Sequence, residues 1–148
     1  MPKTTFEFEV STNKPKAVVI GRDYLIKPIA SLFRQKGLSV QTNLAGQPTG
    51  PVDYIVDVEG NTQLINLAAE TGAKYLRLII GQEEPSYQDN INWRVLKTNF
   101  IIGPNLPKDT LMGQLISQAI KNKILTPPPS DTKIYPLHVN DLAEACWQ

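Results

Sequence analysis

The sequence predicts an α/β domain in which a doubly wound, mostly parallel sheet is covered by helices on both faces. Short apolar runs rich in β-branched residues, such as Lys16–Ile20 and Lys74–Ile80, recur along the chain. Between them lie segments whose apolar residues have the spacing of one helix face. Short apolar strands that alternate with amphipathic helices indicate β–α–β units and a parallel sheet.

Length and composition are those of one ordinary globular domain. The chain has 148 residues, of which 41% are hydrophobic and 20% charged, and its formal net charge is +1. This balance favours neither nucleic acid nor an anionic membrane as a partner. Cys146 is the single cysteine, which excludes an internal disulfide, and residues 1–10 lack the apolar core of a signal peptide. We therefore expect a cytoplasmic protein.

We expect residues 1–15 to form an N-terminal edge strand and linker, and residues 16–148 to form a single domain that is part of a longer chain. In residues 6–10, phenylalanine or valine alternates with glutamate, which is typical of an edge strand with one wet face. Lys16–Ile20 suits a buried parallel strand, and the helical spacing that follows ends at Gly37, a favourable helix C-terminus.

The middle of the chain continues the alternation of strands and helices. A short strand at 38–42 leads into a loop with glycines and prolines, and a third core strand is expected at 52–58. Residues 60–71 have apolar side chains on one face and Gly72 behind them, which predicts a helix with a glycine C-cap. The strand Lys74–Ile80 comes next.

The last third of the chain predicts two strands and two helices. A long strand is expected at 94–102, where a glycine and a proline end it, and a short one at 134–139. Asp109 is a favourable N-cap for a helix at 110–122, and Asp141 for the last helix. The expected core face of the helix at 110–122 consists of Leu111, Leu115, Ile116 and Ala119.

Four segments, in this order, resemble the extended short-chain dehydrogenase/reductase family of nucleotide-sugar epimerases and dehydratases. Residues 17–40 resemble its first strand, turn and helix, and residues 52–80 the stretch whose helix opens with a V-x-G-T pattern. Residues 94–104 resemble the strand that ends in glycine–proline, and residues 115–145 the segment that closes on a histidine and a V-x-D-x-A-x-A helix start. The resemblance implies a Rossmann-like sheet that usually binds a nicotinamide dinucleotide where the strand order reverses.

The glycine turn that this family uses for the cofactor phosphates is degenerate here. Its G-x-x-G-x-x-G pattern falls on Gly21, Tyr24 and Lys27, so only the first glycine is kept. Gly21 and Lys27 are the candidate cofactor contacts, but the alternative that we favour is a solvated Lys27 and a lost site. Pro28, expected in the first helical turn, removes an N–H near the anion position. Asn43 stands where an acidic residue should bind the ribose, and a turn role suits it better.

The residues that the resemblance implies for catalysis are missing. Family chemistry uses a tyrosine and a lysine four residues later on one helix face, helped by a serine or threonine at the end of the preceding strand. No Tyr-x-x-x-Lys sequence occurs in this chain, and the strand in question ends at Ile80 and Gly81 without a hydroxyl. Only residues 81–92 stand where the family has a long helix. We therefore expect no catalytic residues.

Other candidate residues favour structural roles. His138, the only histidine, lies in a short apolar strand, and no cluster of histidines, cysteines and carboxylates has metal-ligand spacing. Asp57 ends a strand near the edge where such sheets bind ligands, but a ligand contact there is the less favoured alternative. Trp93 is best explained as a packing anchor and Cys146 as a small hydrophobe.

The sequence favours a non-catalytic Rossmann-like module without a cofactor, acting as an interaction, regulatory or structural domain of a larger protein. The alternatives are an NAD(P)-dependent epimerase or dehydratase and a nucleotide-binding sensor. We expect the partner to be another protein, a second copy or the rest of the chain. Because polar residues 81–92 cannot cover the sheet face left by the missing helix, we expect the contact at Tyr87, Ile91, Trp93 and the outer side of the helix at 60–71.

Overall fold

The computed structural model describes residues 13–46, 50–86, 88–121, 123–126, 129–131 and 133–148. The expected edge strand at 6–10 and the side chain of Tyr87 lie outside the described residues. The elements follow one another in the order β1 (Lys16–Ile20), α1 (Asp23–Gln35), β2 (Ser39–Gln41), β3 (Tyr54–Asp57), α2 (Thr62–Thr71), β4 (Lys74–Ile80), β5 (Asn92–Thr98), β6 (Phe100–Ile102), α3 (Leu111–Ile120), β7 (Pro136–His138) and α4 (Val139–Trp147).

Five strands form one parallel sheet in the order β2-β1-β3-β4-β5. β1 lies between β2 and β3, so that Val18 is aligned with Gln41 on one side and with Ile55 on the other. β3 confirms the strand expected at 52–58, although it is shorter than expected. The chain runs outward from β1 to β2 and returns across β1 to β3. The strand order therefore reverses between β1 and β3, which is where sheets of this class bind ligands.

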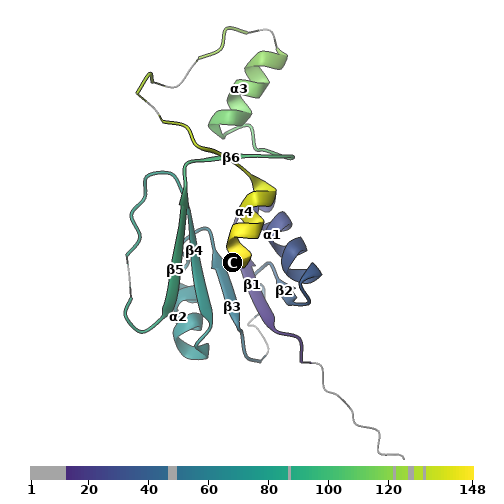
Figure 1. The fold of residues 1–148 in the computed structure, drawn as a ribbon, viewed down its shortest axis with the longest axis vertical. Coiled ribbons are helices and arrows are strands. Elements are labelled where there is room, and N and C mark those ends of the chain that lie inside the picture. Colours follow the sequence, from purple (N-terminus) through teal and green to yellow (C-terminus); the bar gives the residue numbers. More distant parts are fainter. Residues whose placement is uncertain (1–12, 47–49, 87, 122, 127–128, 132) are drawn as a thin grey trace, which may run out of the picture.

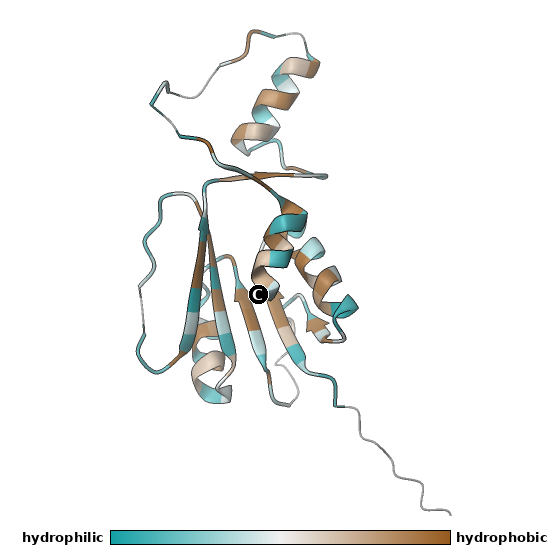
Figure 2. Cartoon of the chain, in the orientation of Figure 1, coloured by the Kyte–Doolittle hydropathy of each residue, from teal (hydrophilic) through white to brown (hydrophobic). Residues whose placement is uncertain are grey.

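Helices cover both faces of the sheet, which confirms the Rossmann-like fold class (Figure 1). α1 and α4 pack side by side on one face, over a core that includes Val19, Leu78 and Leu142. α2 lies on the other face, where Leu64 and Ala68 pack against the strands. Neighbouring residues of β1 alternate between the two cores, as the pleat of a strand requires. Most of β1 is apolar (Figure 2).

The first helix ends as expected and begins earlier. The Gly37 N–H bonds to the Arg34 carbonyl and the Leu38 N–H to the Phe33 carbonyl, and Gly37 has a φ of 93°, so α1 closes with a Schellman motif. Because α1 starts at Asp23, Pro28 lies in its second turn and not in the first. Its missing N–H therefore costs a bond inside the helix and takes nothing from the N-terminal turn.

The strand expected at 94–102 is two strands in two sheets. β5 ends at Thr98, and Asn99 separates it from β6, which pairs in parallel with β7. The Asn99 side chain donates a hydrogen bond of 2.9 Å to the Lys133 carbonyl, which ties this corner to the returning segment. The corner is hidden in the sequence because only Asn99 separates the two strands.

Both predicted N-caps in the last third are wrong, the first by one residue and the second by three. Thr110 caps α3, because its hydroxyl accepts from the Gly113 N–H at 3.1 Å, and Asp109 binds Arg22 instead. His138 caps α4 by accepting from the Asn140 N–H at 3.1 Å, so Asp141 lies in the first turn. A cap on its helix is a structural role for His138, as expected.

The β4–β5 crossover contains no helix among its described residues, and ion pairs hold it on the sheet. Glu83 pairs with Arg77 of β4 at 3.2 Å, and Glu84 pairs with Lys97 of β5. Ile91 and Trp93, expected in an open apolar patch, are half-buried and pack against the core beneath α2. Within the described residues, the large exposed apolar side chains lie elsewhere, chiefly on α3 and the segment that follows it.

Candidate functional site

A cleft of about 350 Å3 lies at the carboxyl edge of the sheet, between the ends of β1, β3 and β4 and the start of α3. Its walls are both apolar and polar, with Tyr24, Val58, Ile80 and Met112 beside Arg22 and Glu83. It lies beside the point where the strand order reverses, so it is the position at which this fold binds ligands. The residues of the turn after β1 decide what the cleft can hold.

Gly21 is needed for packing in this turn. A Cβ at Gly21 would lie 2.7 Å from the Cβ of Val58, just beyond β3. Any larger residue would push the turn away from β3, whether or not a phosphate is bound. The one glycine that survives from the family pattern is therefore explained without a ligand.

Arg22 and Tyr24 occupy the mouth of the turn. The Arg22 guanidinium lies 5.5 Å from the centre of the Tyr24 ring and donates hydrogen bonds of 2.9 and 3.0 Å to the two carboxylate oxygens of Asp109. This pair joins the start of α1 to the residues that lead into α3. The hydrogen bond from Arg22 holds the pKa of Asp109 below its usual value, and burial raises the pKa of Tyr24. The cation nearest the turn is therefore already neutralised by a carboxylate.

Lys27 forms an ion pair on the surface of α1. Its ammonium pairs with Asp23 at 3.1 Å, one helical turn earlier, and both side chains are largely exposed. The structure thus gives Gly21 a packing role and Lys27 a surface ion pair, and it does not join them in a phosphate cradle.

Asp57 is used entirely by the fold. Its carboxylate is fully buried and accepts hydrogen bonds from the N–H groups of Glu59, Gly60 and Asn61 and from the hydroxyl of Tyr75, at 2.6–2.9 Å. Burial and the bond to Asp57 raise the pKa of Tyr75, which keeps its phenol protonated as a donor. Four donors satisfy the hydrogen-bonding capacity of a buried carboxylate, so the Asp57 side chain stabilises the fold and does not face a ligand site.

The remaining candidates are also structural. The Asn43 carbonyl accepts from the Gln41 side chain at 2.7 Å, as a turn residue does. Burial raises the pKa of the Cys146 thiol to about 12, which makes it a poor nucleophile. Within the described residues, no group of three or more histidines, cysteines or carboxylates could hold a metal ion.

Sequence reasoning missed the pair of Arg22 and Asp109 and the buried Arg77. Arg22 and Asp109 are 87 residues apart in the chain, and no periodic pattern links such positions. Arg77 stands in an apolar strand as an isolated charge, which was the one available signal. Its guanidinium reaches the Asp57 carbonyl at 3.3 Å and the Glu83 carboxylate at 3.2 Å.

A second feature lies beyond the cleft, on α3 and the segment behind it. α3 contains no charged residue, yet its only buried residue is Gly113, which packs on the Pro107 carbonyl. Gln118 of α3 accepts from the Thr126 N–H at 3.1 Å, which holds the following segment close to the helix. We name as the contact surface the exposed apolar side chains of α3 and of the segment behind it, Ile116, Ile120, Ile124, Leu125, Ile134 and Tyr135; of these, Tyr135 also lines a hollow with Gly81 and Asn99 at the ends of β4 and β5.

Comparison with models of protein families, with curated proteins and with solved structures gives no match to this chain. In the part of the chain that the structure describes, every helix is too short or too polar to traverse a lipid bilayer.

Replacing Tyr75 by phenylalanine removes one of the four donors to Asp57 and leaves a buried carboxylate under-satisfied. We expect the free energy of unfolding to fall by about 1.5–3 kcal/mol in urea denaturation. Tyr54→Phe is the matched control, because no described residue hydrogen-bonds to its hydroxyl, and we expect a change within about 0.5 kcal/mol. Equal effects of the two variants would contradict the assigned role of Asp57.

Gly21→Ala tests whether the surviving glycine is kept for packing. The added methyl meets Val58, so we expect a loss of about 1–3 kcal/mol in unfolding free energy, measured in the absence of any nucleotide. Gly46→Ala, where no atom of the described residues lies within 4 Å of the added Cβ, should be nearly neutral. If Gly21→Ala is as stable as Gly46→Ala, the packing explanation fails.

Proposed function

We propose that this chain is a non-catalytic Rossmann-like module that works by binding another protein through the contact surface on α3. The observation that carries the proposal is the exposure of an uncharged helix. Ile116 and Ile120 of α3 are 47% and 77% exposed, and Ile124 behind them is 94% exposed. A helix without charges is ordinarily buried, and exposed apolar patches mark contact sites.

The arrangement of α3 supports a surface role over a core role. α3 lies beyond β6, on the side away from the five-stranded sheet (Figure 1). Its apolar residues can be removed from water only by something outside the described fold. If a partner protein covered these side chains, each Å2 of apolar area removed from water would contribute roughly 25 cal/mol of favourable binding free energy.

The proposed relationship to the extended short-chain dehydrogenase/reductase family rests on the four segments in the sequence. They fall on β1 through β2, on β3 through β4, on β5 and β6, and on α3 through α4. The crossover that replaces the family's catalytic helix is held by Glu83 and Glu84, which are ion-pair partners and unsuited to proton transfer from a sugar hydroxyl. We also propose a cytoplasmic location, on the strength of the single cysteine.

A nucleotide sensor is the second candidate, because Arg22 stands at the mouth of the cleft. In that function Arg22 would exchange Asp109 for a phosphate, since guanidinium binds both in the same bidentate manner. The existing pair opposes this, as does the Tyr24 ring in the place where the family leaves bare backbone. An NAD(P)-dependent epimerase or dehydratase needs the same space for its cofactor.

Calorimetric titration with NAD(H), NADP(H), UDP-sugars and ATP separates these functions. For the interaction module, we expect no dissociation constant below about 1 mM, which corresponds to roughly 4 kcal/mol. Asp109→Asn should remain non-binding even though it releases Arg22. Micromolar binding to the wild-type chain, or binding gained by Asp109→Asn, would contradict the proposal and favour the sensor.

A further inference from the structure

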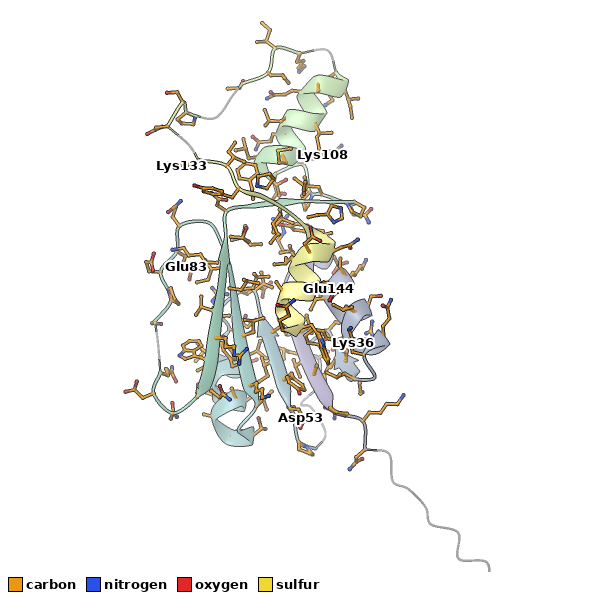
Figure 3. The ribbon with its side chains drawn as sticks, in the orientation of Figure 1. Lys36, Asp53, Glu83, Lys108, Lys133 and Glu144 are labelled. Carbon is orange, nitrogen blue, oxygen red and sulfur yellow. The ribbon has the colours of Figure 1, made fainter. Side chains whose placement is uncertain are left out.

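Lysines predominate among the charged residues of the chain segment that carries the contact surface. Residues 103–135 contain four lysines, Lys108, Lys121, Lys123 and Lys133, and two aspartates, Asp109 and Asp131. Lys108 lies by the start of α3 and Lys133 on the returning segment, in the part of the molecule beyond β6 (Figure 3). Lys121 and Lys123 directly follow the last turn of α3. All four side chains are exposed.

These lysines keep their charge available to a partner. Among the described residues, none of the four forms a salt bridge. Asp109 is already neutralised by Arg22, which leaves Asp131 as the one opposing carboxylate in residues 103–135. The surroundings of the contact surface are therefore positive although the whole chain is almost neutral, with a net charge of +1.

This charge distribution decides between the possible occupants. Two copies that met through the contact surface would bring four lysines toward four lysines, and like charges across an interface oppose association. An interface typically has an uncharged apolar centre and a charged rim, and α3 with its flanking lysines has both parts. Electrostatic complementarity then requires acidic residues on the other side.

A lipid surface fits less well than a protein. Helices that lie in a membrane interface have a strongly charged polar face rich in lysine or arginine. The polar residues of α3 are Gln114, Ser117 and Gln118, which carry no charge. An uncharged polar face suits contact with a protein surface, where amide and hydroxyl groups find hydrogen-bond partners.

We infer that the contact surface binds an acidic amphipathic protein segment, in which apolar side chains meet Ile116 and Ile120 while flanking aspartates or glutamates meet the four lysines. The inference rests on the proposed function and adds the chemistry of the partner to it. When an amphipathic helix binds a protein surface, its apolar residues at helical spacing provide most of the affinity. The charges around them determine partner choice and association rate.

Selection from a displayed library of random peptides, each about four helical turns or roughly 15 residues long, tests this without a known partner. We expect the enriched peptides to combine apolar residues with an excess of aspartate and glutamate. Synthetic copies of them should bind in fluorescence anisotropy and weaken as salt is raised. Ile120→Glu should abolish binding without lowering the unfolding free energy, because its side chain is 77% exposed and outside the core.

Charge variants provide the matched control. Lys121→Glu should weaken the selected peptides about tenfold, since it replaces attraction by repulsion at the rim. Lys14→Glu makes the same change in net charge on an exposed residue of the main body and should leave affinity unchanged.

The outcomes separate the inference from the proposed function. Enrichment of neutral or basic peptides that Ile120→Glu still abolishes would overturn the acidic partner and keep the interaction module. Self-association abolished by Ile120→Glu, or binding to anionic lipid vesicles in preference to every peptide, would also overturn the acidic partner. If no enriched peptide depends on Ile120 and a nucleotide binds with micromolar affinity, both the inference and the proposed function fail.

Discussion

The carboxylate of Asp57 is buried without an opposing charge in direct contact, and hydrogen bonds from four donors keep it in place. Three of these donors are the N–H groups that turn the chain from β3 toward α2, and the fourth is the Tyr75 hydroxyl on β4. The Asp57 carbonyl also accepts from Arg77, which in turn holds Glu83 of the crossover. Asp57 thus links the end of β3 to the neighbouring strand and, through Arg77, to the crossover, and a polar network of this kind must be fully satisfied to be stable.

This network and the turn at Gly21 determine which groups at the carboxyl edge of the sheet remain free to bind a ligand. Asp57 binds the chain itself, Gly21 packs on Val58, and Arg22 pairs with Asp109, so residues of the fold use the groups that a ligand would need. The groups without a partner in the described fold lie instead on α3 and just behind it, where apolar side chains face water and exposed lysines follow them in the chain. The polar groups at the carboxyl edge of the sheet already have partners within the fold, whereas the apolar side chains of α3 are exposed to water. This difference is the basis for proposing protein contact over nucleotide binding.

The sequence predicted the central strands well because β1, β3 and most of β4 are buried and therefore mainly apolar. β1 and β4 fall on the expected residues, and Gly72 caps α2 in the left-handed conformation as expected. The corner at Asn99 was not predicted, since a single residue separates β5 from β6 and the two strands read as one extended segment. The exposure of α3 was hidden for a related reason: an apolar face predicts burial, and only the tertiary structure shows that no described element covers Ile116 or Ile120.

Hydrogen–deuterium exchange, compared with and without a bound peptide selected as above, tests the central claim that α3 is the functional surface. In the free chain, amides of α3 should exchange much faster than those of α1, whose face is buried against the sheet. On binding, protection should rise over α3 and over residues 123–126 and 133–135, while the turn at Gly21 should stay unchanged. Protection confined to the turn and the cleft beside it, or an α3 that is already as protected as α1 in the free chain, would contradict the account.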